Sequence, residues 1–250
     1  MRDRWALALP LVLALAACSP PPPATFELPS ASAPPDPGVS PPPVRLLAAG
    51  ESSPERPQAQ LTDWSERMSD ELNIPRAALQ AYGYAQQMMN ATEPGCGLTW
   101  TVLAGIGAVE SSHGRHGGSR LDATGRPEPR IIGLPLDGSS GVKRIHDTDG
   151  GVLDGDPVWD RAAGPLQFIP STWREYQADA DGDGVADPQD VDDAALTAGR
   201  YLCAVGHDLR DEDRFWAALL DYNQSRSYGQ EVLDYADHYG RTSRSLPAEG

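Results

Sequence analysis

The sequence predicts a mainly α-helical domain, and three observations lead to that prediction. Between residues 62 and 239, apolar side chains recur at the three- and four-residue spacing of helices. Proline stands where first turns would begin, at Pro75 and Pro170, and glycine follows the expected helix ends at Gly206 and Gly240. No segment shows the sustained alternation of a half-buried strand. The helices expected from these signals are residues 62–72, 75–91, 99–112, 170–178, 191–206, 212–222 and 228–239.

Composition divides the chain into four parts. Residues 1–17 begin with a basic stretch and continue with an apolar run too short to span a bilayer, so we expect a signal peptide. Residues 18–57 contain 13 of the 24 prolines and few large apolar side chains, which predicts a disordered, extended linker. Residues 58–241 have the composition of one globular domain, and residues 242–250 are expected to form a disordered tail.

A long stretch within the globular part, residues 114–164, is rich in Gly, Asp and Pro and shows no helical pattern. An insert of this length in a compact domain is either disordered or forms the rim of a functional site. Its acidic segment, residues 147–156, lacks the spacing of an EF-hand, so we expect a polar, turn-rich loop near the site that binds no metal.

The three cysteines indicate an exported protein. Leu15-Ala16-Ala17-Cys18 resembles the lipobox of bacterial lipoproteins, so Cys18 is the expected lipidation site and its acyl chains the expected membrane anchor. The alternative is a plain signal peptide with an incidental cysteine. Cys96 and Cys203 remain, and an even number in an oxidising compartment predicts a disulfide, with two buried free thiols as the alternative. We therefore expect an exported protein anchored by lipid to the outer face of the cell membrane.

The net charge of −16 argues against nucleic acid as a partner, and part of this charge has a specific spacing. Residues 179–190 match the twelve-residue EF-hand loop, with carboxylates at positions 1, 3, 5, 9 and 12 and glycine at position 6. The last position is usually Glu, so the shorter Asp190 predicts modest calcium affinity and a structural role. The alternative is a solvated acidic loop. The expected calcium ligands are Asp179, Asp181, Asp183, the Val185 carbonyl, Asp187 and Asp190.

Glu110 is the residue that most clearly indicates chemistry. It follows an apolar segment, residues 99–109, and shares a helical face with Leu103, Ile106 and Gly107. Removing a carboxylate from water raises its pKa, which keeps a proton available for general acid catalysis near neutral pH. The alternative is a glutamate in the last turn of a helix that points into solvent.

Four motifs occur in a fixed order along the chain. They are residues 108–114 (AVESSHG), residues 164–173 (GPLQFIPSTW), the EF-hand-like loop and residues 221–225 (DYNQS). Together they resemble the membrane-bound lytic murein transglycosylase B family, and residues 147–173 resemble its actinobacterial branch. The resemblance covers about residues 60–240 and implies a lysozyme-like catalytic domain.

The resemblance implies roles for Glu110 and for five residues around the expected cleft. Glu110 would protonate the glycosidic oxygen between N-acetylmuramic acid and N-acetylglucosamine in peptidoglycan glycan strands. It would then act as a base on the muramic C6 hydroxyl, which attacks the anomeric carbon and leaves a 1,6-anhydro sugar. The residues expected to bind substrate are Ser111, Gln167, Phe168, Tyr222 and Asn223.

The chemistry of these side chains fits the binding of a sugar. Gln167 offers an amide donor and acceptor, and Phe168 and Tyr222 offer flat apolar faces. Asn223 is expected to form a hydrogen bond with substrate, and the alternative is a helix C-cap. Ser111 is expected to orient the catalytic carboxylate or to cap its helix.

The sequence leaves the placement of two residues and the choice between several functions open. Trp173 is either a stacking face for a sugar or part of the core, and His113, which no motif pairs with a nucleophile, is expected at the surface. A second carboxylate from the long loop would favour a muramidase, which hydrolyses the same bond. A non-catalytic, calcium-stabilised wall-binding lipoprotein and a calcium-responsive scaffold also fit the sequence. We expect the protein to be a monomer.

Overall fold

The computed structural model of the chain describes residues 28–48, 50–139 and 142–247. The predicted signal peptide, residues 1–17, and the predicted lipidation site, Cys18, lie outside the described residues. Within these ranges, every helix is too short or too polar to span a bilayer.

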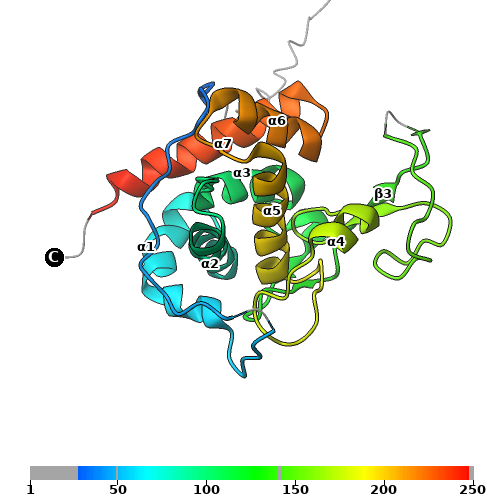
Figure 1. The fold of residues 1–250 in the computed structure, drawn as a ribbon, viewed down its shortest axis with the longest axis horizontal. Coiled ribbons are helices and arrows are strands. Elements are labelled where there is room, and N and C mark those ends of the chain that lie inside the picture. Colours follow the sequence, from blue (N-terminus) through cyan, green and yellow to red (C-terminus); the bar gives the residue numbers. More distant parts are fainter. Residues whose placement is uncertain (1–27, 49, 140–141, 248–250) are drawn as a thin grey trace, which may run out of the picture.

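Seven α-helices dominate the described part of the chain and confirm the prediction of a mainly α-helical domain (Figure 1). Six of them lie within two residues of their predicted bounds. The last helix starts at Arg226, because the Ser225 side chain caps it by accepting from the Tyr228 N–H, and it ends at Ser245. Residues 242–245 are therefore helical, and the predicted tail is wrong there. The α-helices are α1 Thr62–Leu72, α2 Arg76–Thr92, α3 Trp100–Ser111, α4 Pro170–Tyr176, α5 Val191–Gly206, α6 Glu212–Tyr222 and α7 Arg226–Ser245, with 3-10 helices η1 Pro57–Leu61 and η2 His116–Gly118.

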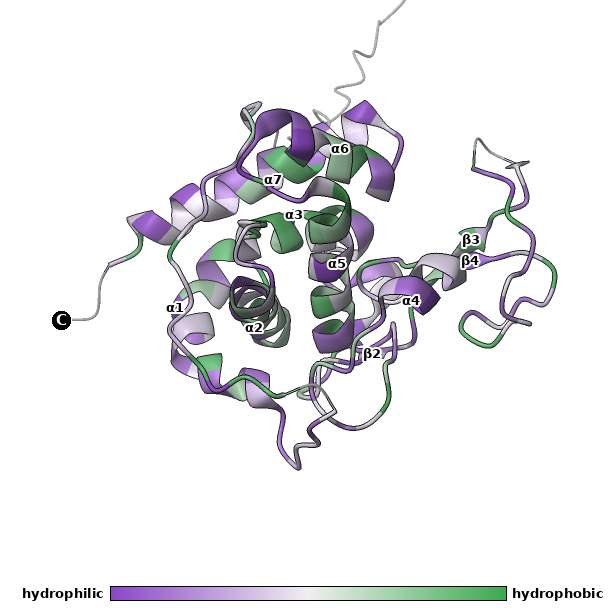
Figure 2. Ribbon diagram, in the orientation of Figure 1, coloured by the Kyte–Doolittle hydropathy of each residue, from purple (hydrophilic) through white to green (hydrophobic). Residues whose placement is uncertain are grey.

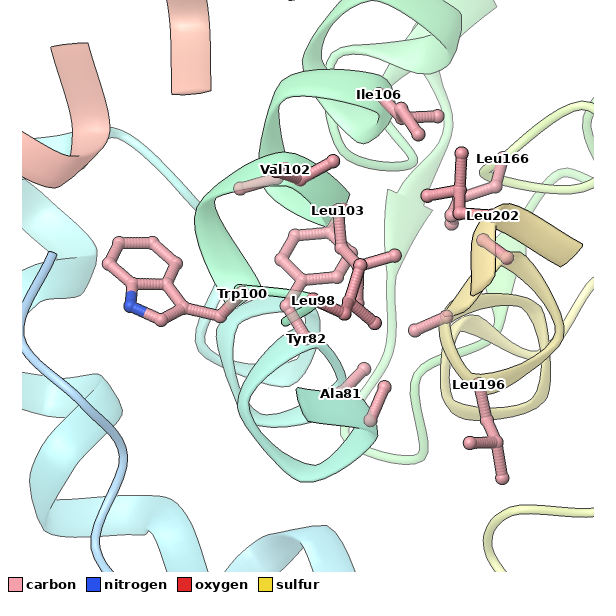
Figure 3. Packing of buried hydrophobic residues seen from close by; sticks show 14 of the residues in the cluster. Ala81, Tyr82, Leu98, Trp100, Val102, Leu103, Ile106, Leu166, Leu196 and Leu202 are labelled. Carbon is pink, nitrogen blue, oxygen red and sulfur yellow. The ribbon is translucent and has the colours of Figure 1, made fainter. Parts of the chain in front are cut away.

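The core lies between α2, α3 and α5. Figure 3 shows Tyr82 of α2, Leu103 and Ile106 of α3 and Leu202 of α5 gathered there, and all four are buried. Helix α3 is apolar nearly all round, as its colour in Figure 2 shows, because it is enclosed by its neighbours. A helix with so few polar positions makes its single carboxylate, Glu110, conspicuous.

Helices α3 and α7 approach each other closely at Gly105. A Cβ at that position would overlap the backbone carbonyl oxygen of Val232 in α7. Glycine therefore allows helices α3 and α7 to lie closer together than any other residue at this position would allow. The contact matters because α3 ends beside Glu110 and the first turn of α7 faces that end.

Residues 132–139 and 142–163 form an arm that projects from the helical body (Figure 1). Residues 114–131 stay against the body, where Arg115 donates to Asn73 and the Gly125 carbonyl accepts from the Val191 N–H. Strands β1 Arg120–Leu121 and β2 Pro127–Glu128 pair antiparallel, as do β3 Ile132–Pro135 and β4 Arg161–Ala163. Aspartates hold the turns of the arm by accepting backbone N–H groups. The sequence left open whether this stretch is disordered or a rim, and the structure favours the rim.

The N-terminal strap, defined as residues 28–48 and 50–57, runs along the helical body in Figure 1. The Val39 carbonyl accepts a 3.0 Å hydrogen bond from the Trp100 indole, and the Ser53 N–H donates to the Gly182 carbonyl at 3.0 Å. The prediction of a disordered linker over residues 18–57 is therefore wrong for the strap. Its prolines favour an extended chain, as expected, but that chain also finds fixed partners on the helices.

A disulfide joins Cys96 and Cys203, with their Cα atoms 5.4 Å apart, and this confirms the predicted bond. Cys96 precedes α3, and Cys203 lies in α5. The bond therefore links the start of the helix that carries Glu110 to the central helix of the core.

Candidate active site

Glu110 lines a cleft of about 600 Å³ between the helical body and the arm. The structure brings together in this cleft the glutamate of the first motif, the Gln167–Phe168 pair of the second, and the Tyr222–Asn223 pair of the last. Glu110 and Gln167, and likewise Phe168 and Tyr222, are more than fifty positions apart in sequence. The complete lining is Glu110, Leu136, Val142, Lys143, Ile145, Ala162, Gln167, Phe168, Ile169, Thr172, Tyr201, Asp221, Tyr222, Asn223, Gln224 and Ser225.

The environment of Glu110 favours its protonated form. Burial raises the pKa of its carboxyl to about 7, and a hydrogen bond from Tyr228 acts in the opposite direction. The Tyr228 hydroxyl donates to Glu110 Oε1 at 2.5 Å. A carboxyl with this pKa can give up a proton near neutral pH and take one back, as an acid–base catalyst must.

Tyr228 is a site residue that the sequence did not reveal. It lies in the first turn of α7, outside the four motifs, and no local pattern marks it as functional. Burial and the nearby charge of Glu110 raise the pKa of the Tyr228 hydroxyl well above its ordinary value, so it stays a donor. Only the long-range packing of α7 against α3 brings it to the carboxylate.

The end of α3 is fixed by an unusual backbone turn. Ser112, His113 and Gly114 have φ values of 51°, 58° and 82°, so three successive residues adopt the left-handed region. The Ser111 hydroxyl donates to the Pro165 carbonyl at 2.6 Å and accepts from the Gly114 N–H at 2.7 Å. This turn ties the second motif to the helix end that carries the glutamate.

Of the roles predicted for Ser111, the structure favours a positioning role at the end of α3 over substrate contact. It is only 2% exposed and does not line the cleft, so substrate contact is excluded in this conformation. Its two hydrogen bonds hold the 164–168 turn against α3. Ser111 positions the site rather than binding the sugar.

His113 is buried, which contradicts the prediction of a surface residue. Its ring lies between the hydroxyls of Tyr82 and Tyr239, at 3.2 Å from Nδ1 and 3.0 Å from Nε2. Burial lowers the pKa of His113 to about 3, so it is neutral at physiological pH. The left-handed turn after α3 directs the side chain back into the core, and local sequence patterns do not reveal such a reversal.

Gln167 and Phe168 both line the cleft, but they contribute in different ways. The Gln167 amide donates to the Gly164 carbonyl at 2.8 Å, and its remaining polar atoms are available for substrate. Phe168 is 3% exposed, and its ring makes edge contacts with Trp173 and Tyr222. The flat stacking face predicted for Phe168 is therefore covered, and the buried Trp173 belongs to the core.

Tyr222 and Asn223 form the wall at the end of α6. The Tyr222 hydroxyl donates to the Leu166 carbonyl at 2.7 Å, which fixes its ring beside the second motif. Tyr201, a cleft residue absent from the prediction, lies next to it with ring centroids 5.5 Å apart. Asn223 follows α6 at its C-cap position with an extended backbone, and its exposed side chain lines the cleft.

Two carboxylates line the cleft among the described residues, Glu110 and Asp221. Asp221 is exposed and accepts a 2.7 Å hydrogen bond from the Tyr201 hydroxyl. The described arm residues in the lining are apolar or basic, so no carboxylate reaches the cleft from the long loop. The feature that would have favoured hydrolysis is thus missing from the described lining.

The acidic loop, residues 179–193, groups its carboxylates differently from the predicted spacing. Oxygens of Asp179, Asp181 and Asp193 lie within 4.8 Å of one another, and Asp193 was not among the expected ligands. The predicted ligand Val185 is an exposed loop residue. Burial raises the pKa of Asp193 to about 9. Three clustered oxygen donors suit a hard cation such as calcium.

The remaining predicted ligands have different partners. Asp183 and Asp187 form ion pairs with Arg126, at 3.1 and 2.6 Å. Asp190 caps α5 by accepting from the Asp192 N–H, and its other oxygen, which is buried, forms an ion pair with Arg126 at 3.3 Å. The turn between β1 and β2 thus supplies a cation, Arg126, to one side of the acidic loop.

Comparison with known proteins gives one family match and two structural likenesses. The profile of the family described as "Transglycosylase SLT domain" matches residues 157–214, which run from the arm through α4, the acidic loop and α5 into α6. No curated protein matches the sequence.

Two solved structures resemble the chain at low identity. The Escherichia coli lytic transglycosylase SLT35 in complex with bulgecin A is 15% identical over 75% of this chain and 84% of that chain, with a TM-score of 0.43. SltB3 from Pseudomonas aeruginosa in complex with NAG-anhNAM-pentapeptide is 18% identical over 76% and 69%, with a TM-score of 0.42. The family profile therefore indicates a similarity of residues 157–214 to the transglycosylase SLT domain.

Proposed function

We propose that the protein is a lytic transglycosylase of peptidoglycan, acting in cell-wall turnover or remodelling. It cleaves the β-1,4 bond between N-acetylmuramic acid and N-acetylglucosamine and leaves 1,6-anhydromuramic ends. The observation that carries the proposal is Glu110, a carboxyl with a pKa raised to about 7 by burial, placed in a cleft with the Gln167 and Asn223 amides. The family match of residues 157–214 supports the same reaction class.

The reaction needs one proton donor that later becomes a proton acceptor. Protonated Glu110 gives its proton to the glycosidic oxygen as the bond to the anomeric carbon breaks. The Tyr228 hydrogen bond stabilises the carboxylate that results. That carboxylate then takes the proton of the muramic C6 hydroxyl while the C6 oxygen attacks the anomeric carbon. The reaction therefore consumes no water.

Product analysis tests the proposal and separates it from a muramidase. Isolated glycan strands are digested with the full-length protein, and the fragments are weighed by mass spectrometry. We expect anhydromuramic ends, and reducing ends heavier by one water would show hydrolysis instead. Absence of cleavage under all conditions would support a non-catalytic wall-binding protein.

Variants of two comparable glutamates test the role of Glu110. Glu110→Gln keeps the shape of the side chain but removes the acid, so we expect cleavage to disappear. Glu71→Gln is the matched control, because Glu71 is also the penultimate residue of its helix, α1, and is exposed far from the cleft. Cleavage that survives Glu110→Gln would refute the assignment.

We also propose that the acidic loop binds one structural calcium ion. Asp179, Asp181 and Asp193 would hold the ion, and the proposal is supported by their oxygens lying within 4.8 Å of one another. An ion here would offset the repulsion among the clustered carboxylates and fix the loop between α4 and α5.

We further propose that the protein is an exported, monomeric lipoprotein of the membrane-bound lytic murein transglycosylase B type. The lipobox at Cys18 supports the lipid anchor, and the net charge of −16 argues against nucleic acid as a partner. Metabolic labelling with a radioactive fatty acid tests the anchor. Label in the wild-type protein and none in Cys18→Ala is the expected result, and label in neither would refute it.

A further inference from the structure

The chain contains a single lysine, Lys143, and this side chain lines the cleft that holds Glu110. It is the one lysine or arginine in the described lining. Lys143 is exposed and makes no ion pair or hydrogen bond with the described residues. In a protein with a net charge of −16, an unpaired ammonium at the cleft is a specific attraction for a negative group of the substrate.

Lys143 lies in the tip hairpin, defined as residues 136–139 and 142–145 of the arm. The Ile145 N–H donates to the Leu136 carbonyl at 2.8 Å, and the Val142 N–H donates to the Ser139 carbonyl at 3.0 Å. Side chains alternate between the two faces of such a ladder. Leu136, Lys143 and Ile145 accordingly share the face that lines the cleft.

The neighbouring cation, Arg144, belongs to the opposite face of the tip hairpin. Its guanidinium lies 5.9 Å from the centroid of the Trp159 ring, and its Nε donates to the Asp137 carbonyl at 3.1 Å. Arg144 does not line the cleft. Lys143 and Arg144 are adjacent cations, but only Lys143 lines the cleft, so Arg144 is a matched control.

The two walls of the cleft have different chemistry. The wall that contains Gln167 and Asn223 offers amides that can form hydrogen bonds with sugar hydroxyls. The tip hairpin offers aliphatic side chains and one ammonium, which suit a short peptide with small apolar groups and a carboxylate. In the proposed substrate, such a peptide is the stem attached to the lactyl group of muramic acid.

We propose that the tip hairpin is the subsite for the peptide stem and that Lys143 pairs with a carboxylate of that stem. The inference rests on the proposed transglycosylase function. It makes Lys143 a specificity-determining residue that favours strands carrying stems. A carboxylate is also present on the lactyl group of strands without stems, so the test must distinguish these two sources.

Kinetics on two substrates test the inference in the full-length protein. One substrate is glycan strands with intact stems, and the other is the same strands after an amidase has removed them. For Lys143→Met we expect kcat/KM to fall about fivefold to tenfold on stem-bearing strands, as for an ionic hydrogen bond near the surface. On stripped strands we expect no change.

Control variants define the other outcomes. Lys143→Arg should retain most of the preference, and Arg144→Met should leave both rates unchanged. An equal loss on both substrates would show that Lys143 binds the lactyl carboxylate, and no loss on either would show that it binds neither. If wild type cleaves neither substrate, or Glu110→Gln cleaves both, the proposed function itself has failed.

Chemical cross-linking gives an independent readout because the chain has only one lysine amine. Glu110→Gln protein is mixed with stem-bearing strands and a water-soluble carbodiimide, which takes up the water lost as the amide forms. We expect the stem to become attached to Lys143 in the peptide map. Strands that remain bound while Lys143 stays unmodified would overturn the proposal.

Discussion

Tyr228 and Glu110 are joined by a 2.5 Å hydrogen bond that connects the first turn of α7 to the last turn of α3. Two effects on the pKa of this carboxyl oppose each other. Burial favours the protonated form, and the hydrogen bond from Tyr228 favours the carboxylate. The balance leaves a pKa of about 7, so the group can act as acid and base in one cycle. The close packing at Gly105 is what brings the two helices near enough.

Activity should depend on the protonation of Glu110. Because the free enzyme must carry the proton, kcat/KM is expected to fall as pH rises through about 7. The measurement is the initial rate of strand cleavage between pH 4 and 9. A descending limb near the ordinary pKa of a free glutamate would show that burial does not raise the pKa of this carboxyl.

Stability should show the same pKa with a defined sign. Between pH 4.5 and about 7 the unfolded chain loses the Glu110 proton while the folded chain keeps it, so the free energy of unfolding falls as pH rises. Glu110→Gln lacks the titrating group, so its free energy of unfolding should not show this fall. The difference in free energy of unfolding between the variant and wild type should therefore increase from pH 4.5 to about 7 and then stay constant. Thermal denaturation at several pH values measures the difference, and Glu71→Gln should show none.

Tyr228→Phe should weaken catalysis without abolishing it. Loss of the donor destabilises the carboxylate, so we expect the pKa of Glu110 to rise and the basic limb of the rate profile to move to higher pH. We expect kcat to fall about tenfold or more, as when a hydrogen bond to a charged group is lost. Tyr235→Phe is the control, because Tyr235 lies on the same helix and Tyr228 is the tyrosine that donates to Glu110. An unchanged pH profile would count against a role for Tyr228.

Calcium removal should lower the melting temperature if the acidic loop holds an ion. Binding at 100 times the Kd would contribute about 2.7 kcal/mol. Asp193→Asn is expected to abolish the calcium effect, whereas Asp187→Asn, which loses an ion pair with Arg126, should retain it. Titration calorimetry compares the two. If Asp187→Asn abolished the calcium effect and Asp193→Asn retained it, the ligand set expected from EF-hand spacing would be correct. The absence of any calcium effect in wild type would exclude a bound ion.

Gly240→Ala should detach the N-terminal strap from α7. A Cβ at this position would overlap the Asp36 carbonyl oxygen, so the strap must move although alanine favours helix by about 1 kcal/mol. We expect a lower melting temperature and faster proteolysis within residues 28–48. Gly95→Ala, where a Cβ meets no atom within 4 Å, is the control. Equal proteolysis of both variants would contradict tight docking of the strap.

The helices and the central part of the site could be predicted from the sequence, because both depend on local signals. Apolar spacing, first-turn prolines and terminal glycines define helices within a few residues. Glu110, Gln167 and Asn223 each lie within a short motif, and the structure brings all three to one cleft. The pairing of Cys96 with Cys203 follows from the number of cysteines, and the structure joins them.

The remaining features depend on contacts between distant segments. Tyr228 reaches Glu110 because two helices pack closely, and Asp193 joins the acidic cluster because α5 turns its first residues toward the loop. His113 was misplaced because a left-handed turn folds the end of α3 inward. No local pattern of residue types encodes that reversal.

The docked strap changes how far the enzyme can work from a membrane. A free linker over residues 18–57 could span about 120 Å, at about 3.1 Å per residue. With residues 28–48 and 50–57 held on the domain, ten residues would separate a lipid at Cys18 from the strap, and a chain of ten residues spans at most about 36 Å. A protein tethered in this way would be confined to glycan strands that lie next to the bilayer and would be kept from the outer layers of the wall.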